Sequence, residues 1–264
     1  MKILFFGDII GKIGRQAIKE ILPKLKKEYQ PDLVVANVEN LAHGIGVTKK
    51  TLDEMIEAGI DFFTSGNHIF KKPEAEELLK ANDSVILRPA NYPGDVPGAG
   101  FRVIEVGSRS VLVINLMGQV FIKEEFDNPF KKIDEILEKV DQKNLAATIV
   151  DFHAEATSEK VAFGWHVDGR VSAVLGTHTH VPTADAKILP QGTAYITDVG
   201  MVGAVDSIIG DRKEPLLASF LTGSAPKVEI PEEGEVEVNA VLLEVSPKTR
   251  KAKKIKRIDR KVKV

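Results

Sequence analysis

Five short apolar runs in the sequence each lead directly into a side chain that can bind a metal ion. Runs of this length, rich in β-branched and aromatic residues, are typical of buried strands. The metal-competent side chains that follow them are Asp8, Glu39, Asn40, Asn67, His68, His153, His178 and His180. In open α/β sheets the functional crevice lies outside the carboxyl ends of the strands. We therefore expect an α/β fold in which these side chains gather at one site.

Two histidines spaced two residues apart, His178 and His180, follow the last of these runs. On extended backbone such side chains point the same way, because successive side chains alternate between the two faces of a strand. Paired catalytic metals lie about 3.5–4 Å apart, so each imidazole could bind one of two neighbouring ions. Taken alone, the motif is equally consistent with two exposed loop histidines that bind nothing.

The composition favours a globular protein without a membrane span or a large basic surface. Hydrophobic residues make up 43% and charged residues 28% of the 264 positions, and the formal net charge is −2. Such a charge argues against binding nucleic acid or an anionic membrane over the whole surface. The chain has no cysteine, which excludes disulfides and thiolate metal sites and suits a cytoplasmic location. No linker or repeat interrupts the pattern, so we expect a single domain over residues 1–264.

The first part of the chain alternates strands and helices, which predicts parallel strands joined by helical crossovers. There we expect strands at 2–7, 32–38 and 60–64, and helices at 13–29, 48–58 and from Pro73 to about residue 80. The remainder adds hairpins to this pattern. There we expect hairpins at 101–115 and 186–196, strands at 146–150 and 171–175, helices at 127–140, 157–164 and 215–221, and a long loop at 197–211.

Lysine and arginine crowd the end of the chain, and two interpretations of this segment are open. It could be a basic arm for nucleic acid or acidic partners. It could instead be an edge strand that its lysines protect from aggregation. Ile255 and Ile258 interrupt the charge, and residues 236–245 can serve as a hairpin partner. We therefore favour a strand over 251–258.

The candidate ligands are carboxylate, amide and imidazole groups without sulfur, a set that suits Fe, Mn, Zn, Ni or Mg. Asp8, Glu39, Asn40, Asn67, His153, His178 and His180 are too many for one catalytic ion and fit two. Glu39 can bridge the ions with its two oxygens. Two ions with a bridging water generate a hydroxide near neutral pH, which can attack a phosphoryl group in line. His68, next to a ligand but not needed as one, is the natural proton donor for the leaving oxygen.

Each candidate also has an ordinary structural interpretation. Asp8 could cap a helix, Asn67 could occupy a turn, and a lone histidine such as His153 is more often a core or surface residue. These interpretations do not explain why all the candidates follow strands. His166 lacks that placement, and we expect it to be structural. His43, in a glycine-bounded loop close to Glu39, remains an open candidate for a substrate contact.

Three motifs resemble the signature blocks of the calcineurin-like metallophosphoesterases. They are Gly7-Asp8, Gly66-Asn67-His68 and Gly176-Thr177-His178-Thr179-His180. The resemblance implies a two-layered β-sandwich flanked by helices, with α-β-β-α layers and a dinuclear metal centre. Two departures from that family's pattern stand out. Ile10 occupies the position of its usual histidine, and Glu39-Asn40 stands where its bridging aspartate is usual.

This variant, together with the segments 88–93 and 193–201, is similar to the bacterial 2′,3′-cyclic-nucleotide 2′-phosphodiesterase family. The similarity implies hydrolysis of 2′,3′-cyclic nucleotides, and of 3′,5′-cyclic ones as an extension, with iron or manganese. One metal would take Asp8, Glu39, Asn40 and His180, and the other Glu39, Asn67, His153 and His178. His68 would protonate the leaving ribose oxygen, and His43, Arg88 and Asn91 are candidate substrate contacts.

Two rival functions stay open. A phosphomonoesterase would use the same centre but needs additional cationic groups for the extra phosphate charge. A non-catalytic regulatory protein would use the basic C-terminal segment to bind RNA or another protein. We expect a small phosphodiester as the ligand, without a membrane or a stable nucleic-acid partner, and leave a homo-oligomer open.

Overall fold

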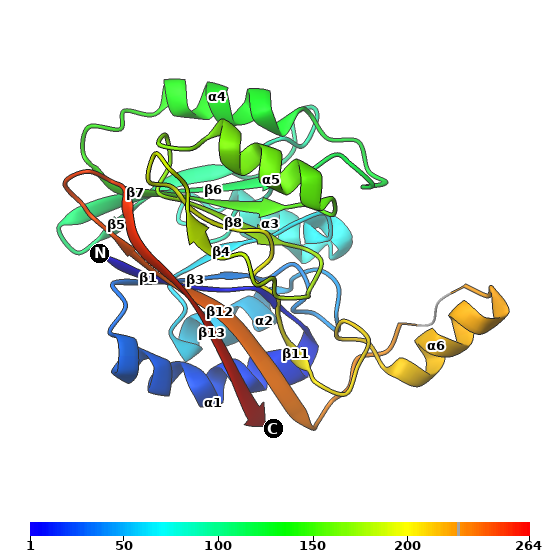
Figure 1. Ribbon diagram of the computed structural model, residues 1–264. Helices are drawn as coiled ribbons and strands as arrows, with labels where there is room; N and C mark the ends of the chain where they lie inside the picture. The colour runs from blue at the N-terminus through cyan, green and yellow to red at the C-terminus, as the bar shows by residue number, and fades with distance from the viewer. Residues whose placement is uncertain (226–227) are drawn as a thin grey trace.

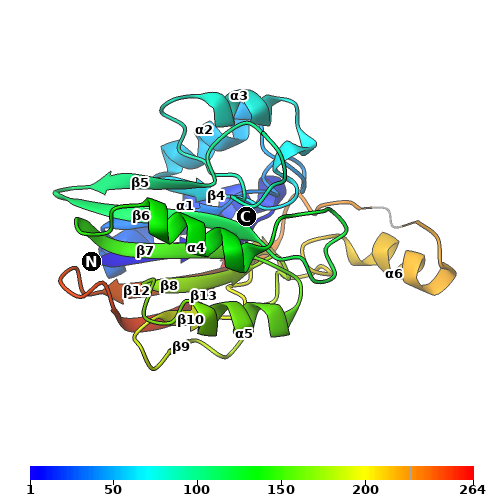
Figure 2. The ribbon, with the colours of Figure 1, turned by 90° about the horizontal axis from the view of Figure 1, so that it is seen from above.

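Two β-sheets packed face to face form the centre of the computed structural model, which describes residues 1–225 and 228–264 (Figure 1). Helices α1 (Gly11–Tyr29), α2 (Lys49–Ala58) and α3 (Glu74–Lys80) cover the outer face of the first sheet. Helices α4 (Pro129–Lys139) and α5 (Thr157–His166) cover the outer face of the second (Figure 2). The α-β-β-α layers expected from the sequence are therefore confirmed.

The first sheet carries the N-terminal strands, and its order is β2-β11-β12-β1-β3-β4, with β13 added to β12. Strands β1, β3 and β4 run parallel, whereas β12 is antiparallel to β1 and β13 is antiparallel to β12. Their bounds are β1 (Lys2–Phe6), β2 (Asp8–Ile9), β3 (Leu33–Asn37), β4 (Phe62–Thr64), β11 (Met201–Ala204), β12 (Glu235–Val245) and β13 (Ala252–Lys263).

The second sheet has the order β5-β6-β7-β8-β10-β9. Strands β6, β7, β8 and β10 are parallel, and hairpins add β5 and β9 at the two edges. Their bounds are β5 (Phe101–Val106), β6 (Arg109–Met117), β7 (Leu145–His153), β8 (Ala173–Thr177), β9 (Lys187–Ile188) and β10 (Ala194–Ile196). Both predicted hairpins are confirmed. The apolar faces of the two sheets meet in a shared core that includes Phe5, Val35 and Ile149.

One edge of the long strand β12 is shared by two strands, β11 at residues 236–238 and β1 at residues 240–244. Asn239 lies at the division and is buried. Its backbone oxygen accepts from Gly7 N, and its side-chain oxygen accepts from Met201 N at 3.1 Å. Asn239 thereby ties the beginning of β2 and the beginning of β11 to one point, next to Asp8.

Two expectations from the sequence were wrong in part. The segment 197–211 is not a continuous loop, because it contains β11, a short glycine-containing strand whose partners β2 and β12 are distant in the chain. Strand β7 also continues to His153 rather than ending at residue 150, since Asp151 to His153 stay paired with β8. The basic C-terminal segment is confirmed as a strand and pairs along the whole of β12.

Two short helices complete the described chain. A 3-10 turn, Ile69–Lys71, follows His68, and α6 (Lys213–Thr222) extends to one side of the layered body (Figure 1). None of the helices in the described ranges is long and apolar enough to cross a membrane.

Candidate metal centre

The carboxyl ends of five strands from both sheets meet at one place. Asp8 opens β2 directly after β1, and Glu39 and Asn40 follow β3. Asn67 and His68 follow β4, His153 ends β7, and His178 and His180 follow β8. The site is thus formed where the parallel strands of the two sheets terminate side by side. Contacts of 3.9 Å or less link seven of the eight residues that the sequence placed there. Asn67 lies in the chain between His68 and Gly66, which packs against Glu39 and His153.

Three of these side chains form a tight group at the end of the second sheet. The Nε2 atom of His153 lies 3.1 Å from Nδ1 of His178 and 3.2 Å from Oε1 of Glu39. One potential ligand atom from each residue falls within 4.8 Å of the others. This spacing suits three ligands of a single ion, whose bonds to nitrogen and oxygen are about 2.0–2.2 Å long.

A second group gathers at the end of the first sheet. The Nε2 atom of His180 lies 3.9 Å from Oδ1 of Asp8 and 3.3 Å from Nδ2 of Asn40. The amide oxygen of Asn40 is turned the other way and lies 3.0 Å from Nδ1 of His68. A half-turn of this amide would direct its oxygen toward His180 and its NH2 group toward His68. Glu39 contacts both groups, since its Oε1 is also 3.4 Å from Asn40 Nδ2.

Two buried oxygens in the cluster have no hydrogen-bond partner among the described residues, namely Oδ1 of Asp8 and Oδ1 of Asn67. An unsatisfied buried oxygen is costly, and most such atoms in folded proteins have a partner. Gly66 lets two of these side chains pack against the backbone, because a Cβ atom there would lie 2.4 Å from His153 Nε2 and 2.2 Å from Glu39 Oε2. A bound cation would satisfy the two oxygens that lack hydrogen-bond partners.

Burial and mutual proximity shift the pKa values of the cluster. Burial raises the pKa of Asp8. Burial also opposes the charge on Glu39, but His153 and His68 outweigh it and hold the pKa of Glu39 well below its usual range. Burial opposes the charge on His153, yet Glu39 and Asp8 raise its pKa to about 9. Burial and the adjacent His153 lower the pKa of His178 to about 3. The buried carboxylates of Glu39 and Asp8 thus favour the protonated form of His153 when no metal is bound.

A buried hydrogen-bond network behind the cluster orients its histidines, and the sequence analysis missed it. With its proton on Nδ1, His153 donates to Thr177 Oγ1 at 2.8 Å, and Thr177 donates to Asp151 Oδ1 at 2.6 Å. Asp151 also accepts from Asn37 and Thr64. This arrangement leaves Nε2 of His153 free as a ligand. Strand periodicity was an available signal, since Asp151 and Asn37 each lie two residues before a candidate ligand on the same strand face.

The two histidines after β8 are oriented separately. His180 donates from Nδ1 to the backbone oxygen of Ile209 at 2.7 Å, so its Nε2 faces Asp8. His178 places Nε2 at 3.1 Å from Glu155, a carboxylate that the sequence analysis also missed, and directs Nδ1 toward His153. Metal-binding histidines commonly have such a partner on the second nitrogen. The nitrogens that these contacts leave for a metal ion are Nε2 of His180 and Nδ1 of His178.

His68 lies beside the centre with one nitrogen engaged and one free. Its Nδ1 lies 3.0 Å from Asn40 and 3.3 Å from Glu39, and its backbone N–H donates to Glu39 Oε2. The ring is partly exposed, and its Nε2 has no hydrogen-bond partner within the described parts of the chain. This geometry leaves one nitrogen available to a molecule that approaches from solvent.

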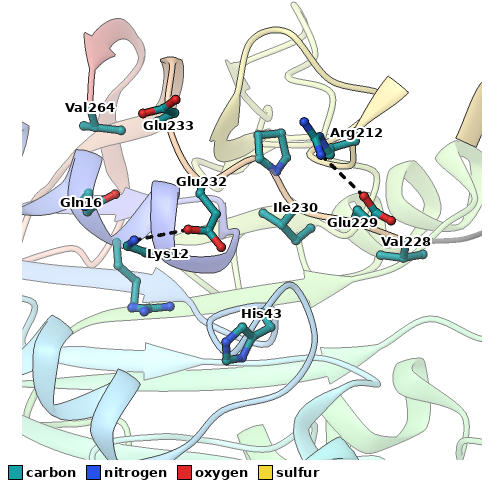
Figure 3. A pocket seen from close by; sticks show the side chains of 12 residues that line it. Lys12, Gln16, His43, Arg212, Val228, Glu229, Ile230, Glu232, Glu233 and Val264 are labelled. Carbon is teal, nitrogen blue, oxygen red and sulfur yellow. Dashed lines mark hydrogen bonds and ion pairs between the residues drawn. The ribbon is translucent and has the colours of Figure 1, made fainter. Parts of the chain in front are cut away.

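The three candidate substrate contacts lie in other surroundings. Arg88 donates to the backbone oxygens of residues 89, 96 and 97, and buried Asn91 bonds to backbone atoms of residues 117 and 127. Both side chains thus hold loops together. His43 lines a groove of about 1030 Å³ between the start of α1 and the segment 228–233, and none of the candidate metal ligands lines it (Figure 3). His166, expected to be structural, contacts Asp134 on the surface at 3.0 Å.

Comparison with known proteins places this arrangement in a family. The profile of the family described as YmdB-like protein matches residues 4–258. A 2′,3′-cyclic-nucleotide 2′-phosphodiesterase from Bacillus subtilis (strain 168) is 45% identical over 260 residues, which cover 98% of this chain and 96% of the relative.

Two solved structures are similar over almost the whole chain. A hypothetical protein from Thermus thermophilus superposes with a TM-score of 0.92 at 41% identity and covers 99% of both chains. A protein from Mycoplasma pneumoniae described as a novel phosphatase superposes with a TM-score of 0.91 at 39% identity, covering 99% of this chain and 93% of its own.

Proposed function

The chain belongs to the YmdB-like protein family, and we propose that it is a phosphodiesterase that hydrolyses 2′,3′-cyclic nucleotides with two bound divalent metal ions. One observation carries the proposal: metal-competent side chains gather from five strand ends, and two buried oxygens there, of Asp8 and Asn67, lack hydrogen-bond partners among the described residues. The name of the Bacillus subtilis relative supports the choice of substrate.

The residues present fit two ions because each of the two groups supplies nitrogen and oxygen ligands around its own space. Asp8, Asn40 and His180 would hold one ion, and Asn67, His153 and His178 the other, with Glu39 shared between them. Asn40 would bind through its oxygen after the half-turn of its amide. The donor set suits iron or manganese, with zinc or magnesium as alternatives. When bound, such ions activate water as a nucleophile and neutralise the charge of a phosphoryl group.

His68 would supply the proton that the leaving ribose oxygen needs. Asn40 and Glu39 orient its Nδ1, which leaves Nε2 of this partly exposed ring for a substrate. Because Glu39 also accepts from the backbone N–H of His68, the shared carboxylate fixes the position of the acid. Imidazole is suited to this task, since its ordinary pKa of about 6.5 lets it hold and release a proton near neutral pH.

The charge around the centre favours a diester over a monoester. A monoester carries additional negative charge, and the cationic side chain of Arg88 is already engaged by backbone oxygens. The proposal therefore places phosphomonoesters among the poor substrates. It leaves 3′,5′-cyclic nucleotides as secondary substrates, because the same centre could attack them.

The test is a substrate panel with purified protein loaded with Mn²⁺ or Fe²⁺. Adenosine 2′,3′-cyclic phosphate should be opened to the 3′-phosphate, and adenosine 3′,5′-cyclic phosphate should be hydrolysed more slowly. Faster release of phosphate from 2′- or 3′-adenosine monophosphate would favour the phosphomonoesterase. Salt-sensitive binding of RNA without any turnover would favour the non-catalytic function.

A further inference from the structure

A fully buried ion pair lies behind the turn that carries His178 and His180. Lys160, on α5, and Asp198, between β10 and β11, have side chains that are 1% and 0% exposed. Their Nζ and Oδ2 atoms are 2.7 Å apart. Neither residue belongs to the candidate ligand set, and neither forms a hydrogen bond or ion pair with a candidate ligand side chain in the described structure.

The polar atoms of this pair are directed at the residues on either side of His178. Lys160 donates to the backbone oxygen of Thr177 at 2.8 Å. Asp198 Oδ2 accepts from the backbone N–H of Thr179 at 3.1 Å and from its hydroxyl at 2.8 Å. The other oxygen, Oδ1, accepts from Gly200 N. The pair thus fixes the backbone before His178 and the backbone between His178 and His180.

That turn needs to be fixed because its conformation is unfavourable. His178 and His180 both have positive φ angles, 99° and 64°. Residues other than glycine adopt such angles rarely, and they keep them only where the surroundings over-determine the backbone. The strained turn is what directs Nδ1 of His178 toward one side of the site and Nε2 of His180 toward the other.

We propose that Lys160 and Asp198 are positioning residues that hold the two histidines in place for metal binding before any ion arrives. The inference rests on the proposed metal centre. A purely stabilising role does not explain the choice of residues, because replacing a buried ion pair with well-packed apolar groups is often neutral or stabilising. Charged partners bind three separate polar groups of the turn at once, which an apolar pair cannot do.

The test is the affinity of metal-free protein for Mn²⁺, measured by calorimetry, together with the melting temperature without metal. The double variant Lys160→Met/Asp198→Asn removes both charges together, so neither is left unpaired in the interior. It removes the contact of Lys160 with Thr177 and the charge that Asp198 presents to Thr179. We expect it to bind Mn²⁺ about 10-fold more weakly, the lower end of the loss that follows when groups orienting metal ligands are removed. Its melting temperature without metal should stay close to that of the wild type.

Glu159→Gln is the matched control. Glu159 is a buried acid on the same helix, next to Lys160, but its carboxylate accepts from the backbone of residues 119 and 120 instead of from the histidine turn. We expect Glu159→Gln to leave the Mn²⁺ affinity unchanged. An equal loss of affinity in this control and in the double variant would overturn the proposal.

Thr179→Val covers the case in which the double variant does not fold. It removes only the hydroxyl that Asp198 accepts from, and it should weaken Mn²⁺ binding in a folded protein. If Thr179→Val binds Mn²⁺ as tightly as the wild type, and the double variant either does the same or misfolds, the pair serves stability alone. If the wild type itself binds no Mn²⁺, the proposed metal centre is wrong. That result is distinguishable from the first, in which the wild type and the variants all bind the metal.

Discussion

Two regions of the molecule, the proposed metal centre and the groove of Figure 3, differ in the burial and pairing of their charged groups. In the groove, Lys12 and Glu232 pair at 3.5 Å with side chains that are 55% and 78% exposed. At the centre, Asp8, Glu39 and His153 are buried, and an oxygen of Asp8 has no hydrogen-bond partner among the described residues. The groove is spacious, but the charges of Lys12 and Glu232 are solvated and paired with each other.

Volume alone singles out the groove, and a lone buried atom without a hydrogen-bond partner, Nε of Arg257, also occurs outside the cluster. We therefore base the proposed site on the gathering of several buried ligand-type side chains in one place. An exposed ion pair contributes about 0–1 kcal/mol and can form on any surface. A buried carboxylate oxygen without a hydrogen-bond partner is costly, and a bound cation would compensate that cost.

Glu39→Gln should remove both ions and reduce phosphodiesterase activity to background. Glu39 contacts both groups of ligands, and the neutral amide of glutamine lacks the negative charge with which the carboxylate would bridge two cations. Elemental analysis of the purified variant checks the result. Loss of only one ion would show that Glu39 does not bridge.

His68→Ala should keep both ions and the fold but lose about 10²–10⁴-fold in the rate of hydrolysis of a cyclic nucleotide, which is the usual contribution of a general acid. A diester with an acidic phenol as leaving group provides the control. A phenolate needs little protonation, so this substrate should lose much less. Equal losses for both substrates would assign His68 to another task.

Part of this site could be predicted because the ends of buried strands can be located in the sequence. Apolar runs locate the strands, and the polar residues that follow them, such as Asp8 and Asn67, locate the centre. The supporting contacts could not be predicted in the same way, because they join distant segments. Asn37 and Asp151 are 114 positions apart, and the strand β11 is stabilised by β2 and β12 rather than by its own pattern. The motifs predict Arg88 and Asn91 as substrate contacts, and this stays a prediction. The structure shows Arg88 bonded to loop backbone and Asn91 bonded to the end of β6.

Removing the metal should destabilise the protein, and restoring it should reverse the change. A metal ion that binds only the folded state raises the free energy of unfolding by about 2.7 kcal/mol when its concentration is one hundred times Kd. Thermal unfolding with EDTA and then with excess Mn²⁺ measures the difference. In Glu39→Gln the shift should vanish, whereas a retained shift would locate the stabilising ion elsewhere.

Changes in the groove should have the smallest effects. Lys12→Ala breaks an exposed pair, so we expect a change in the free energy of unfolding below about 1 kcal/mol and unaltered metal content. His43→Ala should leave kcat/KM unchanged, because His43 lines the groove, which no candidate ligand lines. A raised KM in His43→Ala would extend the substrate site into the groove and weaken the contrast between the two regions.

The number of ions at the centre decides whether the proposed dinuclear site exists. Crystals of metal-replete protein, measured with anomalous diffraction at the iron and manganese edges, locate each ion and identify its ligands. We expect two ions joined by Glu39, one beside Asp8, Asn40 and His180 and the other beside Asn67, His153 and His178. A single ion, or none, in fully loaded protein would rule out the dinuclear centre.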